Sequence, residues 1–423
     1  MKISKKDALM WFRFFAALPE EEEILPHQQE IVYATFAQIE AAVEQRNAQL
    51  MAQIPGLQSL AGRTYFVGPE QHFPKGCRSC LLGTGLSAIR KTNKCNLNCK
   101  FCYYYGQLDC MPPIGEGMWE IGGTKFYEHD LDLLLSIYPK PSGISYVYLE
   151  PFMEIEQYYP VIRKFHEAGI YQHMYTNGTL ATEQNLRALA EAGLDELRFD
   201  LDATHCADKV IEAMGIAKQY LPMVGIETPM SPEFKAAFLK KKQAILDTGA
   251  DFMNCAELHL NENNLPNFLG ENIYISRQGY ISPIWSREVT LQLMRLAAEE
   301  QWSMTLHDCS NRTKFARDLN LRSKDGSFFG TSNYANEFDR IPYEAFLPIL
   351  EDESFAFLEE EPLPKGYRPG DIVLSGFRKK KHCCRQCFFI FRAFQPDTVY
   401  TVFIHKKWGR RSKSNPPHSM FTL

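Results

Sequence analysis

The chain has 423 residues, of which 45% are hydrophobic and 23% charged, and its formal net charge is -5. This is the composition of an ordinary globular protein, long enough for one large catalytic domain with appendages or for two to three smaller domains. It excludes a low-complexity chain, and it excludes a membrane-spanning one because no apolar run approaches the roughly 18 to 20 residues that cross a bilayer.

The first 60 residues predict helices. The apolar stretch ALMWFRFFAAL is followed by HQQEIVYATFAQIEAAVEQRNAQLMAQI, whose apolar residues keep a helical spacing until Pro55 and Gly56. Arg13 interrupts the first stretch and an acidic run follows it, so we expect no cleavable signal and predict a cytoplasmic protein without a membrane partner. We assign residues 1–72 to a helical N-terminal extension.

From about residue 84, short strand-like runs alternate with helical ones, which is the pattern of βα units around a parallel sheet. Helical runs lie at 155–169, 181–193 and 232–249. The predicted strands are 86–92, 145–151, 171–177, 196–202, 223–229 and 251–261, with 302–308 as a candidate seventh.

Side chains in these strands alternate between an apolar face and a polar face. A closed barrel fills its lumen with branched apolar side chains, so a polar face predicts a more open barrel that holds a polar ligand. An antiparallel or doubly wound sheet with one wet face is the alternative. The predicted polar face consists of Tyr146, Tyr148, Glu150, Glu196, Arg198, Asp200, Asp202, Cys255, Glu257, His259 and Asn261.

Three residues of this face are our catalytic candidates. Cys255, Glu257 and His259 alternate along one predicted strand, and the Cys255 thiol could donate a hydrogen atom to a substrate radical. A buried inert thiol is the alternative for Cys255, and structural hydrogen bonds are the alternative for the other two.

The last hundred residues differ in composition from the rest. Residues 320–377 are rich in Pro, Gly and acidic residues and predict irregular structure, and CFFIFRAF and TVYTVFIHKK predict a hairpin around QPD. From Arg378 to Lys413 there are eleven Lys or Arg and one Asp, which leaves -15 for the remainder (-5 minus +10). Such a tail can attract nucleic acid or an acidic protein, or it can be a solvated surface. We assign 73–320 to the barrel and 321–423 to a C-terminal module.

Twelve cysteines in clusters favour metal binding over secreted disulfides. Cys95, Cys99 and Cys102 form a C-x3-C-x2-C motif in the loop after the first predicted strand. Three thiolates can hold three irons of a 4Fe-4S cluster and leave the fourth iron without a protein ligand. A zinc site of three cysteines and a histidine is the main rival, but the loop contains no histidine.

Two further cysteine pairs lie outside this motif. Cys77-x2-Cys80 and Cys384-x2-Cys387 could together make a four-thiolate site, with Cys383 as a substitute for Cys384. Neither pair is followed by the glycine that favours a zinc or rubredoxin-type knuckle. The absence of this glycine therefore favours a second iron-sulfur cluster over zinc or mononuclear iron.

With these motifs, the sequence resembles the radical S-adenosylmethionine (radical SAM) superfamily over roughly residues 84–310. The resemblance consists of the cysteine motif with Phe101 before its third cysteine, and of residues 146–203, which are similar to the second to fourth βα units of the family. Where the family usually has Gly-Gly-Glu-Pro, this chain has Tyr148, Leu149, Glu150 and Pro151. The family's Thr-Asn-Gly is retained as Thr176, Asn177 and Gly178.

The resemblance implies an α/β fold with a partial (βα)6 TIM-like barrel, a 4Fe-4S cluster at the cysteine motif and S-adenosylmethionine as cofactor. One-electron reduction would split the cofactor to a 5'-deoxyadenosyl radical that abstracts hydrogen from the substrate. Flavodoxin or ferredoxin would supply the electron. The implied cofactor-binding residues are Phe101, Tyr103, Glu150, Pro151, Thr176, Asn177, Gly178, Asp200 and Asp202.

Residues 76–102 also resemble a branch related to the pyruvate formate-lyase activating enzymes, in which a cysteine pair precedes the radical motif. Residues 254–264, NCAELHLNENN, are similar to an Asn-x-x-Glu-plus-Asn segment of that branch. Three hypotheses follow: a radical SAM enzyme acting on a small polar, amino-acid or peptide substrate; a radical SAM enzyme modifying RNA; and an iron-sulfur or zinc redox protein that does not cleave the cofactor.

Overall fold

The structure is a computed structural model of the whole chain, and the residues that it describes are 40–60, 62, 64–82, 86–111, 113–121, 124–138, 140–261, 263–268, 271–275, 280–311, 313, 377–379 and 385–387. The chain forms two compact units. The first consists of residues 1–3 and 36–353, and the second of residues 4–35 and 354–423. The three domain boundaries that we derived from the sequence stay a prediction.

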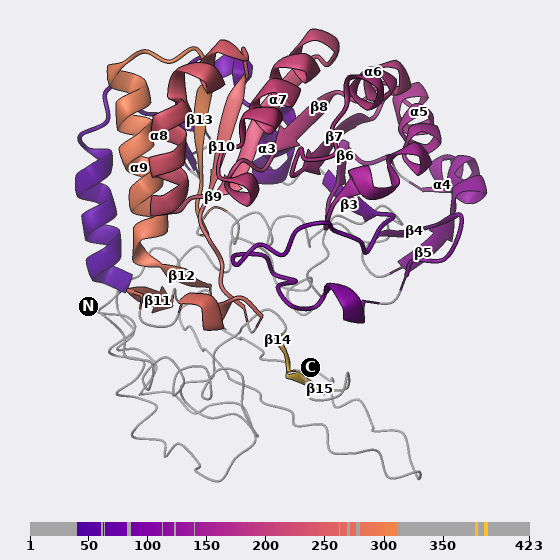
Figure 1. The fold of residues 1–423 in the computed structure, drawn as a ribbon, viewed down its shortest axis with the longest axis horizontal. Coiled ribbons are helices and arrows are strands. Elements are labelled where there is room, and N and C mark those ends of the chain that lie inside the picture. Colours follow the sequence, from indigo (N-terminus) through magenta and orange to yellow (C-terminus); the bar gives the residue numbers. More distant parts are fainter. Residues whose placement is uncertain are drawn as a thin grey trace, which may run out of the picture. The chain divides into compact units, whose positions relative to one another are not determined.

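Seven parallel strands form the centre of the first unit, and they lie side by side in chain order (Figure 1). Each of the seven predicted strands is present, including the candidate seventh. The parallel strands are β3 (Leu86–Arg90), β6 (Gly143–Tyr146), β7 (Tyr171–Thr176), β8 (Glu196–Phe199), β9 (Met223–Pro229), β10 (Phe252–Ala256) and β13 (Thr305–Cys309).

Antiparallel strands extend this sheet at both edges. Next to β3 lie β4 (Met118–Ile121) and β5 (Thr124–Tyr127), and next to β13 lie β2 (Thr64–Val67) and β1 (Gln58–Leu60). No pairing between β5 and β1 closes the ring among the described strands. The fold is therefore an open α/β barrel, as the polar strand face predicted.

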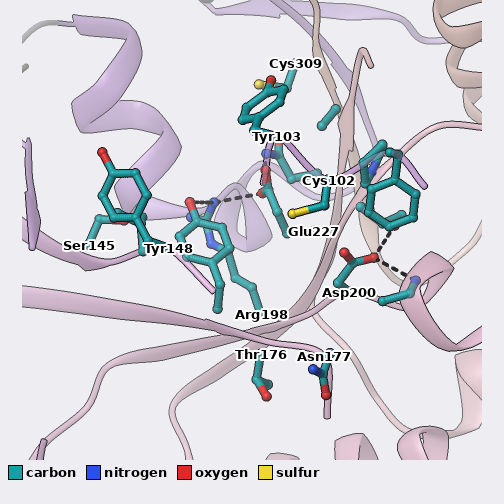
Figure 2. A pocket seen from close by; sticks show the side chains of 18 of the residues that line it. Cys102, Tyr103, Ser145, Tyr148, Thr176, Asn177, Arg198, Asp200, Glu227 and Cys309 are labelled. Atoms are coloured by element: carbon teal, nitrogen blue, oxygen red, sulfur yellow. Dashed lines mark hydrogen bonds and ion pairs between the residues drawn. The ribbon is translucent and has the colours of Figure 1, made fainter. Parts of the chain in front are cut away.

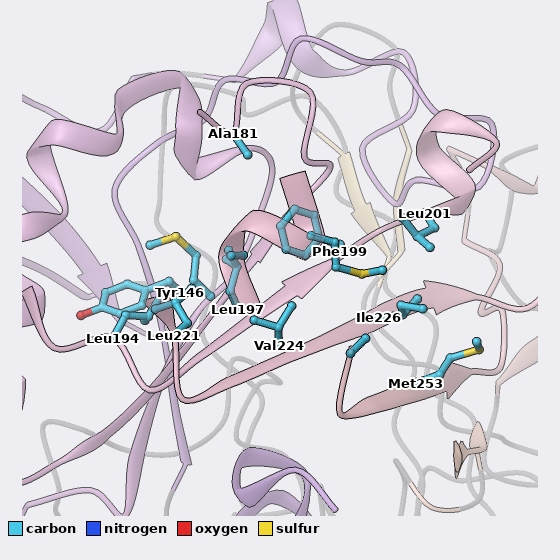
Figure 3. Packing of buried hydrophobic residues seen from close by; sticks show 14 of the residues in the cluster. Tyr146, Ala181, Leu194, Leu197, Phe199, Leu201, Leu221, Val224, Ile226 and Met253 are labelled. Carbon is cyan, nitrogen blue, oxygen red and sulfur yellow. The ribbon is translucent and has the colours of Figure 1, made fainter. Parts of the chain in front are cut away.

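Helices connect the parallel strands and cover the outer face of the sheet (Figure 1). Their side chains and those of the strands form one hydrophobic core, which includes Leu186 of α6. Figure 3 shows Leu197, Phe199 and Ile226 of the same core. The helices are α4 (Leu131–Ile137), α5 (Tyr159–Glu167), α6 (Glu183–Ala192), α7 (Asp208–Tyr220), α8 (Pro232–Asp247) and α9 (Ile284–Glu299).

Local sequence signals explain where several of these helices begin and end. Thr182 and Ser231 cap α6 and α8, because their side chains accept hydrogen bonds from the backbone N–H groups three residues later. Pro232 occupies the first turn of α8, where the missing N–H costs nothing. Gly193 ends α6 in the left-handed conformation that glycine adopts without a steric penalty.

One helix lies on the inner side of the sheet. In α3 (Lys75–Leu82), Gly76 packs so closely that a Cβ atom would come within 2.6 Å of the His173 ring and 3.0 Å of Arg198 Nη2. The next residue, Cys77, accepts a hydrogen bond from Arg198. Because β7 and β8 supply His173 and Arg198, the first cysteine pair of the sequence faces the inside of the barrel.

The remaining elements are short. Residues 40–51 are helical, in agreement with the predicted N-terminal helices, whereas residues 1–39 lie outside the described ranges. The pair β11 (Ile273–Ile275) and β12 (Ile281–Pro283) precedes α9. In the second unit, β14 (Phe377–Lys379) pairs antiparallel with β15 (Arg385–Cys387), and the predicted hairpin of residues 387–407 lies outside the described residues except for Cys387. Within the described ranges, none of the helices combines the length and apolar character that a bilayer span requires.

Candidate functional site

A cavity of about 500 Å³ opens at the carboxyl ends of the parallel strands. This is the end at which parallel βα folds carry their functional groups. Figure 2 shows side chains from the parallel strands, and from the loops that follow them, around this space. The strand residues that line it include Ser145 of β6, Tyr175 and Thr176 of β7, Arg198 of β8, Glu227 and Thr228 of β9, Asn254 and Ala256 of β10, and His307 and Cys309 of β13.

Cys95, Cys99 and Cys102 all line this cavity, from the irregular loop that follows β3. Two of the sulfurs accept backbone hydrogen bonds: Cys95 Sγ from the Leu97 N–H at 3.5 Å, and Cys102 Sγ from the Tyr104 N–H at 3.4 Å. Burial raises the pKa of all three thiols. The free thiols are therefore neutral at neutral pH, and binding a metal as thiolates would release protons.

These residues fit a 4Fe-4S cluster. Among the described residues, no three His, Cys, Asp or Glu side chains are placed to hold one metal ion. A cluster makes a different demand, because each thiolate binds a different iron and N–H donors to the sulfurs tune its electronic properties. Three thiols on the wall of one cavity, two of them with such donors, supply this donor set.

Glu150 ties the loop after β6 to the end of β7. Its carboxylate accepts hydrogen bonds from Thr176 Oγ1 at 2.7 Å, from the Asn177 N–H at 2.7 Å and from the Phe152 N–H at 3.1 Å. Burial raises the pKa of Glu150 to about 7, although these hydrogen bonds oppose the shift. Glu150 also lines the cavity, so one side chain both orders two loops and forms part of the cavity wall.

The two residues before Glu150 have left-handed backbone conformations. Tyr148 has φ 73° and Leu149 has φ 57°, and each such residue costs about 1 to 3 kcal/mol when it is not glycine. The backbone therefore keeps the shape that glycines would adopt, but it places two side chains at the cavity wall. The Tyr148 ring lies between the Arg90 guanidinium, 5.3 Å from its centroid, and the Tyr104 ring at 6.3 Å.

Asp200 and Asp202 follow β8 but differ in position. Asp200 lines the cavity and accepts hydrogen bonds from Thr228 Oγ1 at 2.6 Å and from the Ala203 N–H at 3.2 Å (Figure 2). Burial raises the pKa of Asp200 to about 7. Asp202 accepts from Ser231 and is not part of the lining, and burial raises its pKa to about 6. Asp202 therefore does not face the cavity.

Phe101, Tyr103, Asn177, Glu257 and His259 also line the cavity. The rings of Tyr103 and His259 meet edge to face with centroids 5.6 Å apart, so the cysteine loop contacts the segment that follows β10. Both carboxylate oxygens of Glu257 are occupied. They accept hydrogen bonds from the Tyr274 hydroxyl and from the Asn311 N–H.

The remaining candidates do not line the cavity. Pro151 is buried in the first turn of the 3-10 helix η4 (Pro151–Gln157). Gly178 has φ 74°, and a Cβ atom there would come within 2.6 Å of Val210 and 2.9 Å of Phe199. Both residues shape the loops that carry Glu150 and Asn177.

The predicted placement of Cys255 on the polar face is wrong. Asn254 and Ala256 of β10 line the cavity, so Cys255 between them points to the opposite face and is buried in the hydrophobic core. The strand ends at Ala256, and the alternation that linked Cys255 to Glu257 does not continue past that residue. The assignment of Tyr146 fails in the same way, because β6 ends there and its ring packs in the core.

Sequence reasoning did not single out Cys309, Asn254 or the contacts of Arg198. Cys309 ends β13 and lines the cavity. Its position just after the candidate seventh strand was the feature of the sequence that could have identified it. Arg198 is buried and forms ion pairs with Glu196 and with Glu227, the latter at 3.0 Å. Glu227 in turn accepts from Asn254, whose other amide atom contacts His307. Burial lowers the pKa of His307 to about 3, so it is neutral.

The outer cysteines are only partly described. Cys77 and Cys80 lie three residues apart on α3, and both line the cavity. Cys383 and Cys384 lie outside the described residues, and Cys387 ends β15 in the second unit. The predicted four-thiolate site of Cys77, Cys80, Cys384 and Cys387 therefore stays a prediction.

Comparison with known proteins gives one family match: residues 89–227 match the radical SAM superfamily. A protein of Methanocaldococcus jannaschii, named as a candidate glycyl-radical enzyme activating enzyme, is 27% identical over 46% of this chain and 53% of its own length. A tungsten-containing aldehyde ferredoxin oxidoreductase cofactor-modifying protein of Pyrococcus furiosus is 24% identical over 40% of this chain and 49% of its own length. The chain thus spans about half the length of the curated relatives it matches. The crystal structure of methylornithine synthase is similar with a TM-score of 0.35 at 14% identity, covering 60% of this chain and 73% of that one.

Proposed function

We propose, from the match of residues 89–227 to the radical SAM superfamily, that the protein reductively cleaves S-adenosylmethionine and abstracts hydrogen from a small polar, amino-acid or peptide substrate. The observation that carries the proposal is the placement of Cys95, Cys99 and Cys102 together on the wall of the cavity at the carboxyl ends of the strands. When bound, the cluster and the cofactor supply one-electron cleavage to a carbon radical.

The chain's own residues would position and shield that chemistry. Cys95, Cys99 and Cys102 would each bind one iron, while Phe101 and Tyr103 offer aromatic surface beside the cluster loop. Glu150 fixes the Thr176–Asn177 loop through two hydrogen bonds and presents a carboxylate to a ligand ammonium. The cavity lies within the barrel, which limits the access of water to a reactive radical.

Charge supports an ammonium-bearing substrate. Four carboxylates line the cavity: those of Glu150, Asp200, Glu227 and Glu257. Arg198 is the single Lys or Arg in the described lining, and it is already paired with Glu196 and Glu227. With Glu227 paired to Arg198, the carboxyl groups of Glu150, Asp200 and Glu257 remain, and a cationic ligand would stabilise their charged forms. The name of the Methanocaldococcus relative supports the peptide alternative, because an enzyme that activates a glycyl-radical enzyme acts on a polypeptide.

The first experiment tests cleavage itself. The protein is reconstituted anaerobically with iron and sulfide and incubated with dithionite and S-adenosylmethionine, and 5'-deoxyadenosine is quantified by chromatography. We expect formation of 5'-deoxyadenosine by the wild type. If the protein binds a cluster but forms no 5'-deoxyadenosine, it is a redox protein and the proposed function fails.

The second experiment tests the substrate class. Free amino acids and their N-acetylated counterparts are compared as stimulators of 5'-deoxyadenosine formation. We expect stimulation by compounds with a free ammonium group and none by the acetylated forms, because acetylation removes the positive charge that the cavity carboxylates would bind. Flavodoxin and ferredoxin are the proposed electron donors and can replace dithionite in the same assay.

A further inference from the structure

The segment that follows β10 contacts the backbone of the cysteine loop through asparagine side chains. Asn261 and Asn263 both donate to the carbonyl of Tyr103, at 3.1 and 2.6 Å. Asn264 donates to the carbonyl of Phe101 at 2.8 Å, and Asn267 donates to the carbonyl of Lys100 at 2.7 Å. We call Asn261, Asn263, Asn264 and Asn267 the asparagine clamp.

With the clamp in place, every carbonyl from residue 99 to residue 103 has a hydrogen-bond donor. The carbonyls of Cys99 and Cys102 accept from the N–H groups of Cys102 and Tyr105 within the loop, at 2.9 and 3.0 Å. The other three carbonyls accept from the clamp. An irregular loop has no ladder to satisfy its backbone, so side chains from another segment must do so.

One of these carbonyls belongs to a peptide group with a direct contact to a cluster ligand. The Tyr103 carbonyl shares its planar peptide with the Tyr104 N–H, and in a trans peptide the two bonds point in opposite directions. That N–H donates to Cys102 Sγ at 3.4 Å. Holding the carbonyl on one side therefore aims the N–H at the sulfur on the other.

We propose that Asn261 and Asn263 are positioning residues that hold the Tyr104 N–H on the Cys102 sulfur and so raise the reduction potential of a cluster bound there. N–H donors to cluster sulfurs stabilise the reduced, more electron-rich state. Water could satisfy the Tyr103 carbonyl if the asparagines were absent, but it would not fix the orientation of the peptide plane. The inference rests on the proposed cluster at Cys95, Cys99 and Cys102.

The clamp supplies its own matched control. Asn267 donates to the Lys100 carbonyl, which shares a peptide with the Phe101 N–H, and in the described part of the chain that N–H donates to no sulfur. Asn267→Ala removes the same type of hydrogen bond from the same loop without touching an N–H···S contact. It therefore separates tuning of the cluster from a general loosening of the loop.

Two variants remove the tuning contact in steps. Among the described residues, the Asn263 side chain donates its hydrogen bond to Tyr103, so Asn263→Ala is the simpler change. Asn261 also orders the turn, because its Oδ1 accepts from the N–H groups of Asn263 and Asn264 at 3.0 and 3.2 Å. Asn261→Ser keeps a side-chain acceptor for that turn while it removes the amide donor. The double variant Asn261→Ser/Asn263→Ala lacks both donors to Tyr103.

The full-length protein and its variants are reconstituted anaerobically, and the reduced cluster is followed by electron paramagnetic resonance during a redox titration. We expect a more negative potential in Asn263→Ala and a larger shift in the double variant. At a fixed potential, the double variant should show about a fivefold lower ratio of reduced to oxidised cluster, the factor that corresponds to one neutral hydrogen bond. Asn267→Ala should match the wild type.

The outcomes separate two failures. A wild-type protein that binds no cluster overturns the proposed function. A wild-type cluster whose potential is the same in Asn263→Ala and in the double variant, or an equal shift in Asn267→Ala, overturns this inference alone. Should the double variant bind no cluster, Asn263→Ala decides, because it keeps the Asn261 donor.

Discussion

The two faces of the central sheet differ in how they use the same strands. On the outer face of β8, Leu197 and Phe199 are completely buried among helix side chains (Figure 3). Burying such a side chain contributes about 1.5 to 3 kcal/mol without any requirement for a partner of opposite charge. On the inner face, Glu196 and Arg198 are equally buried but are paired with each other.

Burial therefore has opposite consequences on the two faces. The outer face stabilises the fold directly through apolar contact. The inner face holds charges whose desolvation cost is offset only while each charge keeps its partner. We therefore expect substitutions on the outer face to change stability, those in the cysteine loop to change activity, and those in the inner ion pairs to change both.

The largest effect should come from the cysteine loop. Cys99→Ala removes one of three cluster ligands, so we expect 5'-deoxyadenosine formation to be abolished. The unfolding temperature of the apo-protein should stay that of the wild type, because the thiol lies in a loop outside the strand ladders. Cys110→Ala is the control: Cys110 is an exposed cysteine after the same motif and does not line the cavity. Equal loss of activity in both variants would contradict the assignment of the cluster ligands.

A substitution in the inner-face ion pair should change both stability and activity. Arg198→Met leaves Glu196 buried without its cation, and we expect a loss of about 4 kcal/mol in the free energy of unfolding, measured with urea. Glu196→Gln added to Arg198→Met removes the stranded charge and should restore part of that loss. If adding Glu196→Gln to Arg198→Met lowers the free energy of unfolding further, the broken ion pair is not the reason for the instability.

A substitution on the outer face should change stability and leave activity unchanged. Leu197→Ala leaves a cavity in the core and should lower the free energy of unfolding by about 3 kcal/mol. At temperatures where the variant stays folded, its rate of 5'-deoxyadenosine formation should remain close to that of the wild type. A large drop in rate at unchanged stability would show that the two faces are not separable.

The smallest effect concerns pH and Glu150. Burial raises the folded-state pKa of Glu150 to about 7 from its usual 4.5, so between these values the folded apo-protein binds a proton that the unfolded chain has lost. This group's contribution is fully present below pH 4.5 and is lost as the pH rises to about 7, by at most about 3 kcal/mol. Glu150→Gln should flatten the fall in unfolding free energy over this range. An identical slope in wild type and variant would mean that another group causes it.

Local sequence patterns were sufficient to predict most of the fold. All seven parallel strands were located from runs of strand-forming residues between helical ones, and the cap residues of α6 and α8 are visible in the sequence. The cysteine loop was located as well, because its C-x3-C-x2-C spacing follows a strand. These features depend on residues that are close together in the chain.

The sequence was less informative about which side chains reach the cavity. Predicting that Cys255 points away from the cavity required knowing the register and end of β10 at Ala256, because a shift of one residue moves a side chain to the other face. Cys309 lines the cavity instead, at the end of a strand whose existence was uncertain from local pattern alone.

The sequence alone predicts the alternation of strands and helices and the cysteine motif, and residues 89–227 match the radical SAM superfamily. Only the tertiary structure decided which residues meet across the barrel. The contact between Asn263 and Tyr103 joins residues 160 positions apart, and Arg198 pairs with Glu227 from the neighbouring strand. The physical reason is that periodicity reports burial along one segment, whereas a hydrogen bond or ion pair between segments depends on where each strand ends and how the sheet curves.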